Sequence, residues 1–151
     1  ETVAELAVEI AQACKERGLT VDVKLVETGA LLHDIGRAKT HSVYHAVAGA
    51  EIAESIGLPQ PIISIIKRHV GGGIVKSEAK KLGWPSDVYV PKTLEEKIVA
   101  YADKLVEGSR RVPIEKTIDN LSRKIPSDAV ERIIKLHAEM ATFAGDCKCR
   151  P

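Results

Sequence analysis

Apolar residues recur at intervals of three and four along almost the whole chain, which is the spacing of one face of an α-helix. The first stripe holds, in order, Val3, Leu6, Ala7, Ile10 and Cys14. Gly18 marks its end, because glycine readily adopts the backbone conformation that closes a helix. Further stripes predict helices over residues 22–33, 45–56 and 61–70, and a shorter polar helix over 74–82.

The second half of the chain continues this pattern. Thr93 followed by Glu96 forms a capping box, in which each side chain accepts from the backbone N–H of the other residue, and a helix that reaches Val106 is expected to follow it. A weaker helix is expected over 113–124, and Ser127 is expected to cap a last helix. No stretch shows the strict alternation of apolar and polar residues that is typical of a half-buried strand. The pattern predicts an all-α fold.

The length and composition narrow the class of protein. A chain of 151 residues suits one domain, and no repeat, low-complexity segment or linker divides it. Hydrophobic residues make up 44% of the chain, which excludes intrinsic disorder, while no apolar run approaches the roughly 20 residues of a membrane span. The 22 basic and 21 acidic residues give a formal charge of +1, which offers no overall attraction to nucleic acid or anionic lipid.

The cysteines bear on the cellular compartment. Cys14, Cys147 and Cys149 are too few for a disulfide framework, which favours a reducing environment. The chain shows no leader of the secretory type. We therefore expect a cytoplasmic protein.

Several ionisable residues occupy positions that should be buried. His45, His69 and Asp103 each fall on the apolar stripe of a predicted helix, and His33 and Asp34 directly follow the apolar end of another. An unpaired buried carboxylate costs several kcal/mol, so such groups are normally paired or bound to a metal. For any one residue, a hydrogen-bonded core position is the simpler interpretation. With the adjacent His33 and Asp34 counted as one, there are four inward sites, and together they combine imidazoles with carboxylates. This combination favours a shared site for a divalent ion.

The adjacency of His33 and Asp34 places a condition on the backbone. Neighbouring side chains on a regular helix point about 100° apart and cannot easily reach one ion. If the helix ends at this pair, with Gly36 relieving the backbone, both side chains can turn toward a common point. We therefore expect a helix end here.

Four segments extend this set of residues: Leu32-His33-Asp34-Ile35-Gly36, His45-Ala46-Val47-Ala48-Gly49-Ala50, Lys67-Arg68-His69-Val70-Gly71-Gly72 and Tyr101-Ala102-Asp103-Lys104-Leu105. In order and spacing they resemble the HD superfamily of metal-dependent phosphohydrolases, in its HDIG form. The resemblance covers about residues 1–112 and implies a single helical HD-domain bundle with its core there. Residues 113–151 are expected to form C-terminal helices that pack on the same domain.

The resemblance also implies a set of metal ligands. His33, Asp34 and Asp103 would hold a first ion, and Asp34 would bridge to a second ion held by His45 and His69. The two additional histidines are typical of the dinuclear branch, which includes bacterial symmetrical diadenosine tetraphosphate hydrolases and HD-GYP phosphodiesterases. The segment 102–111 is closer to the former, and the absence of a Gly-Tyr-Pro motif argues against the latter. We expect one or two divalent ions, of Fe, Mn, Mg, Zn, Ni or Co.

One departure from the family pattern concerns the start of the chain. The family's first ligand is a histidine at the head of the first helix, usually four residues before a Val-Ala pair. The segment Val3-Ala4-Glu5-Leu6-Ala7 resembles the residues that come after that histidine, so the ligand is expected just before Glu1. Either the chain starts a few residues inside the natural protein, or the site lacks one ligand.

The reaction that the resemblance implies is hydrolysis of a phosphoester or phosphoanhydride bond in a nucleotide-like substrate by metal-activated water. Asp34, as the bridging carboxylate, is the expected catalytic residue. Guanidinium groups match phosphate oxygens bidentately, so four arginines are candidates for substrate binding, although a solvated surface position explains each equally well. They are Arg37, Arg68, Arg110 and Arg111.

Two other classes of function stay open. A catalytically silent metal-binding or ligand-sensing HD module is the alternative, since the expected first histidine is missing. A nucleic-acid-binding domain has only Lys80-Lys81 and Arg110-Arg111 in its favour, so nucleic acid is an unlikely partner. The expected partner is a small phosphorylated compound, with no membrane, and the sequence does not determine the oligomeric state.

Overall fold

The computed structural model describes residues 1–145 and is almost entirely helical, which confirms the all-α prediction. Four helices precede the glycine-rich segment 71–73, and four follow it. In chain order they are α1 (Thr2–Glu16), α2 (Val23–Leu32), α3 (His45–Ser55), α4 (Gln60–Lys67), α5 (Lys76–Lys81), α6 (Leu94–Lys104), α7 (Ile114–Ser122) and α8 (Ser127–Ala144). A 3-10 turn, η1 (Ile35–Ala38), joins α2 to the loop before α3. Cys147 and Cys149 lie outside the described residues.

Helix starts follow local chemistry. The side chain of Asp22 accepts a hydrogen bond from the backbone N–H of Leu25 and caps α2. The predicted capping box of Thr93 and Glu96 is present at the start of α6. The expected cap at Ser127 is wrong, because Pro126 occupies the cap position with extended backbone and the serine is the first helical residue.

Two short strands interrupt the helical pattern. Val106, expected in the helix that precedes it, belongs to β1 (Val106–Glu107), which pairs antiparallel with β2 (Arg110–Arg111). Gly108, with a φ of +62°, makes the turn between them. Strands of two residues are too short to show an alternating pattern, so the sequence did not reveal them.

A second difference concerns the segment after the glycines. Ile74 pairs with Tyr89 in an isolated bridge and does not begin a helix, and α5 starts only at Lys76. The backbone N–H of Ile74 donates to the carbonyl of Tyr89 over 3.0 Å. This bridge holds the two ends of the segment that carries α5 close together.

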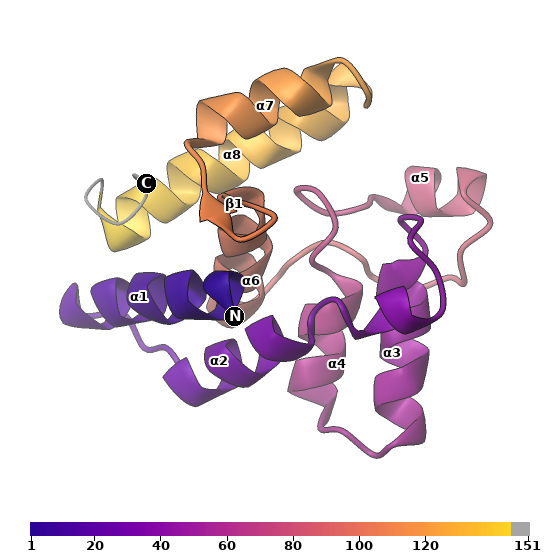
Figure 1. Cartoon of the computed structure of the whole chain (residues 1–151), viewed down its shortest axis with the longest axis horizontal. Coiled ribbons are helices and arrows are strands. Elements are labelled where there is room, and N and C mark those ends of the chain that lie inside the picture. The colour runs from indigo at the N-terminus through magenta and orange to yellow at the C-terminus, as the bar shows by residue number, and fades with distance from the viewer. Residues whose placement is uncertain (146–151) are drawn as a thin grey trace.

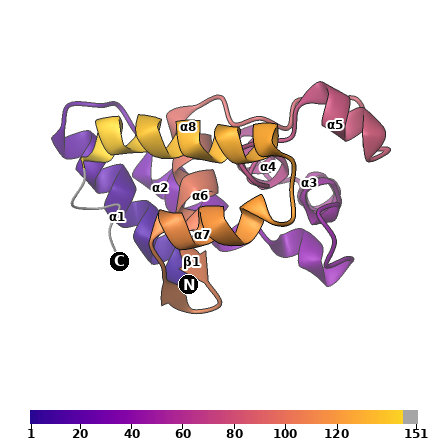
Figure 2. The ribbon, with the colours of Figure 1, turned by 90° about the horizontal axis from the view of Figure 1, so that it is seen from above.

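The central helix of the main core is α6. Figure 1 shows α1 and α2 below and to the left of it and the α7–α8 pair above it. Helices α3, α4 and α5 extend to the right in the same view. The side chains of Ile98, Val99 and Tyr101 in α6 are fully buried. They belong to one hydrophobic cluster with Ile10 of α1 and Met140 of α8, so both ends of the chain pack on α6. Figure 2 shows α7 and α8 lying side by side.

Two glycines allow the turn after α2 to press against α3. A Cβ atom on Gly36 would lie 1.8 Å from the carbonyl oxygen of His45. A Cβ atom on Gly49 would lie 2.7 Å from Cγ2 of Ile66 and 3.1 Å from the backbone nitrogen of Gly36. A side chain at Gly36 would collide with the backbone of α3, and one at Gly49 would displace Ile66, so the two glycines let the ends of α2, α3 and α4 come together.

No helix among the described residues has the length and apolar character needed to cross a membrane.

Candidate metal centre

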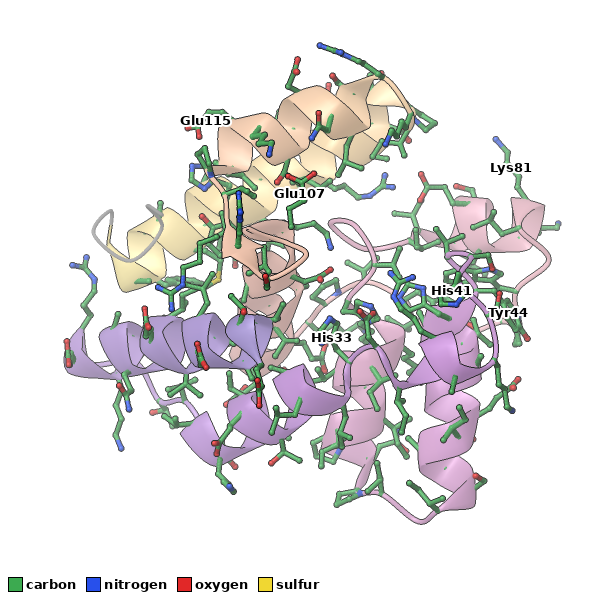
Figure 3. All side chains as sticks on the ribbon, viewed as in Figure 1. His33, His41, Tyr44, Lys81, Glu107 and Glu115 are labelled. Atoms are coloured by element: carbon green, nitrogen blue, oxygen red, sulfur yellow. The ribbon has the colours of Figure 1, made fainter. Side chains whose placement is uncertain are left out.

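All five predicted ligands lie at or near helix ends, and these ends converge. His33 is the last, capping residue of α2, and Asp34 directly follows it, as the sequence predicted. His45 opens α3, His69 comes two residues after α4, and Asp103 lies in the last turn of α6. Figure 3 shows His33 at the end of α2, turned toward the space between the helices.

The carboxylate of Asp34 lies at the centre of the group. Its Oδ1 is 3.2 Å from Nε2 of His45 and 3.5 Å from Nε2 of His69. Its Oδ2 is 3.5 Å from Nε2 of His33, which in turn lies 3.3 Å from Oδ1 of Asp103. Oδ1 of Asp34 thus lies toward His45 and His69, and Oδ2 lies toward His33. A carboxylate that bridges two ions would be placed in this way.

Each of the three imidazole rings is oriented by a backbone carbonyl three residues earlier in the chain. Nδ1 of His33 donates to the carbonyl of Ala30 over 2.6 Å, and Nδ1 of His69 donates to that of Ile66 over 2.6 Å. Nδ1 of His45 donates to the carbonyl of Ser42 over 2.8 Å. A carbonyl can only accept, so Nδ1 carries the proton and Nε2 presents a lone pair in each neutral ring. Metal-ligating histidines commonly donate their second nitrogen in this way.

The donor atoms fit a divalent cation. Three Nε2 lone pairs and two carboxylates face one another, and Nε2 of His33 is buried without a hydrogen-bond partner among the described residues. Ligand atoms of His33, Asp34 and His69 all lie within 4.8 Å of one another. Imidazole and carboxylate ligands suit borderline and hard divalent ions. The group could therefore hold a metal ion, and a positive charge would relieve the repulsion between these acceptors.

The surroundings keep both carboxylates ionised. Burial alone would raise the pKa of Asp34, but its close contacts with His45 and His69 hold that pKa well below its usual range. Burial likewise opposes ionisation of Asp103, and the charge of Lys104 outweighs it, so the pKa of Asp103 is also held well below its usual range. At neutral pH the site presents two negative charges.

The imidazoles respond to the same charges in different ways. Burial lowers the pKa of His69, and its contact with Asp34 only partly offsets this effect, so the ring stays neutral. Burial also acts to lower the pKa of His33, but Asp103 and Asp34 together raise it. A neutral ring with a free lone pair is the form that binds a metal.

Two cations lie beside the carboxylates. Nζ of Lys104 donates to Oδ2 of Asp103 over 2.5 Å, and Nε of Arg37 lies 3.1 Å from Oδ2 of Asp34. Lys104 was missed from the sequence, although it directly follows Asp103, because lysine on a helix is usually solvated. The structure buries it, with 9% of its surface exposed.

The four candidate arginines are placed differently from one another. Arg37 lies beside Asp34. Arg68 makes two hydrogen bonds to the carboxylate of Glu96, and Arg111 makes two to the carboxylate of Glu9. The remaining arginine, at position 110, is exposed on β2. The structure therefore brings only Arg37 into contact with a predicted ligand, and it holds Arg68 and Arg111 in ion pairs with other residues.

A cavity of about 610 Å³ adjoins the ligands and was not foreseen from the sequence. Asp103 and Lys104 of α6 line it, and so do Leu121 of α7 and Ile125, which follows α7. It joins segments far apart in the chain, so no local pattern could have indicated it.

The fold and the ligand group together define a helical domain built around a cluster of histidine and aspartate side chains that could hold a metal ion. The family model described as "HD domain" matches residues 1–108, and the chain belongs to the HD-domain family.

Two curated relatives extend the match. A tRNA (cytidine(56)-2'-O)-methyltransferase of Thermoplasma volcanium is 46% identical over 145 residues, which are 96% of this chain and 41% of the relative. An uncharacterized protein of Methanocaldococcus jannaschii is 46% identical over 140 residues, which are 91% of this chain and 83% of the relative. The chain thus spans less than half of the length of the methyltransferase.

The HD domain of the Listeria monocytogenes phosphodiesterase PgpH has a similar fold. The TM-score is 0.56 with 22% sequence identity, and the match covers 95% of this chain and 89% of that domain. The same domain is also known in complex with cyclic-di-AMP, with a TM-score of 0.55 and 21% identity over 96% of this chain and 89% of that domain. At this identity the likeness establishes the fold.

Proposed function

We propose that the chain is a metal-dependent phosphohydrolase that cleaves a phosphoester or phosphoanhydride bond of a nucleotide-like substrate. The observation that carries the proposal is the convergence of three Nε2 lone pairs on two ionised carboxylates. A divalent ion bound there would lower the pKa of a bound water and polarise the phosphoryl oxygens. The HD-domain membership supports the same class of reaction.

The ligands divide into two groups around Asp34. His33, Asp34 and Asp103 would hold a first ion, and His45 and His69, with Oδ1 of Asp34, would hold a second. The role of Asp34 as catalytic residue follows from this bridging position. Its two oxygens would keep the ions at a fixed separation, which the in-line displacement of a phosphoryl group requires.

The cations beside the ligands have a role in binding phosphate. Arg37 pairs with Asp34 through Nε, so its guanidinium is near the point where a phosphoryl oxygen would lie. Lys104 lines the adjoining cavity and would neutralise charge on the substrate. Arg68, Arg110 and Arg111 stay in the proposal as further phosphate contacts, although Arg68 and Arg111 would first have to leave their carboxylate partners.

The proposed substrate is a nucleotide. The similar PgpH domain is known with cyclic-di-AMP, and the cavity beside Asp103 is large enough for a nucleotide-sized ligand. Within this class we propose dinucleoside polyphosphates first, on the sequence resemblance of residues 102–111. The methyltransferase relative acts on tRNA by its name, so the terminal phosphate of an RNA is the second substrate to test.

The test combines metal analysis with a substrate panel. The purified chain is loaded with Mn, Fe, Zn, Ni, Co or Mg, and hydrolysis is measured on mononucleotides, dinucleoside polyphosphates, cyclic dinucleotides and short RNAs. Asp34→Ala is expected to lose both bound metal and activity. Asp119→Ala, which removes an exposed carboxylate paired with Arg123, is the matched control and should retain both.

The outcomes separate the proposal from its alternative. Full activity of Asp34→Ala, or a wild-type chain that binds no metal, would overturn the phosphohydrolase. Bound metal without turnover on any substrate would favour a silent metal-binding or ligand-sensing module.

A further inference from the structure

We propose that the cavity beside Asp103 binds the base of a nucleoside phosphate, and that the α7–α8 hairpin provides the wall that selects it. The inference rests on the proposed function, which places the phosphate at the ligand group. The cavity of about 610 Å³ is lined by Asp103 and Lys104 and also by the apolar Leu121 and Ile125. A ligand whose phosphate lies at Asp103 can therefore place its base against these apolar side chains.

The body of the cavity is apolar. Val70 and Val106 line it, and Leu121, Ile125 and Ala129 line it from the α7–α8 hairpin. Two further apolar residues of the lining are exposed: Val43 at 47% and Leu82 at 48%. Ligand pockets typically combine an apolar lining with a few polar groups that fix orientation. A flat apolar group would bury these surfaces.

The charges around the cavity favour an anion. Two acidic residues of the lining already have cationic partners, since Glu78 pairs with Arg132 and Glu107 with Lys116. Lys81 and Lys124 line the cavity and form no ion pair within the described residues. The uncompensated charge is therefore positive, which suits a ligand with an apolar body and a phosphate.

The polar groups of the lining favour a base over an alkyl chain. The side-chain amide of Asn120 can both donate and accept, and the hydroxyl of Thr117, which donates to the carbonyl of Lys104 over 2.6 Å, can still accept. The three consecutive glycines of the lining carry no side chain, so their backbone can approach a ligand closely. A base can pair with such groups through its own hydrogen-bonding edge when it covers them, whereas an aliphatic chain cannot.

The part of the lining that the α7–α8 hairpin contributes lies outside the family match. The HD-domain match ends at residue 108, whereas Thr117, Asn120, Leu121 and Lys124 belong to α7 or the turn after it and Ala129 to α8. The ligand group is therefore a property of the family, and this wall is a property of the hairpin that comes after it. Figure 2 shows the hairpin alongside α6.

The test is calorimetric titration of the manganese-loaded chain with adenosine 5′-monophosphate, inorganic phosphate and octyl phosphate. Ala129→Phe places a large side chain in the cavity, and Asn120→Ala removes the amide from an exposed position of α7. The first variant is expected to raise the Kd for the nucleotide about tenfold or more and leave that for phosphate within about twofold. Ala138→Phe, at an exposed position of α8 outside the lining, should change neither.

Asn120→Ala keeps the test decisive if Ala129→Phe does not fold. This variant should weaken the binding of the nucleotide and leave the binding of phosphate unchanged. Unchanged nucleotide affinity in the folded variants, or octyl phosphate that binds as tightly as the nucleotide, would overturn the base subsite. Nucleotide binding of this kind without hydrolysis of any substrate would overturn the phosphohydrolase and leave the subsite standing. Hydrolysis with a KM that Ala129→Phe does not change would overturn the base subsite and leave the phosphohydrolase standing.

Discussion

Nε2 of His45 lies 2.9 Å from Nε2 of His69, although the Nδ1 proton of each ring is already donated to a backbone carbonyl. Two neutral rings in this state present lone pairs to each other. Only a cation, either a proton or a metal ion, makes the contact favourable, and burial lowers the pKa of His69 and so disfavours the proton. The contact therefore supports the proposed metal site.

Removal of metal is expected to destabilise the fold. A ligand at about 1,000 times its Kd stabilises the native state by about 4 kcal/mol. Treatment with a chelator should therefore lower the Tm of the wild-type chain in differential scanning fluorimetry, and excess manganese should restore it. Asp34→Ala is the control, since its Tm should not respond to the chelator. An identical Tm of the wild-type chain with and without chelator would contradict the proposed metal site.

The two sides of Asp34 should be separable by mutation. His45→Ala removes a ligand of the proposed second ion but leaves His33, Asp34 and Asp103 in place. Plasma mass spectrometry of the loaded variant should find one ion fewer than in the wild-type chain. His41→Ala, which changes an exposed histidine outside the ligand group, should keep the wild-type ratio. A normal metal content of His45→Ala would show that this histidine is not a ligand.

Gly36→Ala should be strongly destabilising. The added methyl group would lie 1.8 Å from the carbonyl oxygen of His45 and 2.6 Å from the backbone nitrogen of Gly49, and backbone atoms cannot move aside as a side-chain end can. We expect a loss of about 3 kcal/mol or more in the free energy of unfolding, measured with urea. Gly57→Ala meets no atom within 4 Å but has a φ of +74°, so its cost should be only about 1–2 kcal/mol. Since Gly36 has no positive φ, a loss there no larger than that of Gly57→Ala would contradict the close approach.

Glu96 links the start of α6 to the end of α4. It is 4% exposed and accepts two hydrogen bonds from Arg68 and one from the backbone N–H of Lys92. Glu96→Ala leaves the partly buried guanidinium without a partner and should cost about 3–5 kcal/mol in urea unfolding. Asp119→Ala, which breaks the exposed pair with Arg123, should cost less than about 1 kcal/mol. A small effect at Glu96 would suggest that Arg68 is free to bind phosphate.

The pair of Asp87 and Lys67 predicts a pH effect away from the ligand group. Slight burial acts to raise the pKa of Asp87, but the hydrogen bond from Lys67 outweighs it and lowers the pKa. A carboxyl group whose pKa is lowered by folding stabilises the native state above its unfolded pKa and loses this effect as the pH falls through its folded pKa. The stability difference between wild type and Asp87→Asn should thus be full at pH 7 and shrink below about pH 4. A difference that is constant down to pH 2 would contradict the pairing.

The helices were predictable because each buries an apolar stripe with a helical period. The convergence of these side chains was predictable for the related reason that His45, His69 and Asp103 interrupt such stripes, and a resemblance of four segments assigned them to one group. The ends of helices were less certain, as Ser127 and Val106 show, because one proline or a hairpin of two-residue strands decides them.

Other features depend on contacts between distant parts of the chain. The guanidinium of Arg68 was open to several interpretations until the fold placed Glu96 against it, 28 residues later in the sequence. The same holds for the cavity, to which α7 and α8 contribute only after they pack on α6. The burial of Lys104 likewise results from tertiary packing, which the spacing of apolar residues in the sequence does not reveal.

The orientation of each histidine is set by the carbonyl three residues before it, in Ala30, Ser42 and Ile66. Only the backbone carbonyl of each residue takes part, so the orientation of a ring does not depend on the chemistry of that residue's side chain. During evolution the donor atoms can therefore persist unchanged while the helices that carry them shift relative to one another. Since the separation of the donors selects among metal ions, drift in helix packing could change the metal that a related chain prefers without replacing a single ligand.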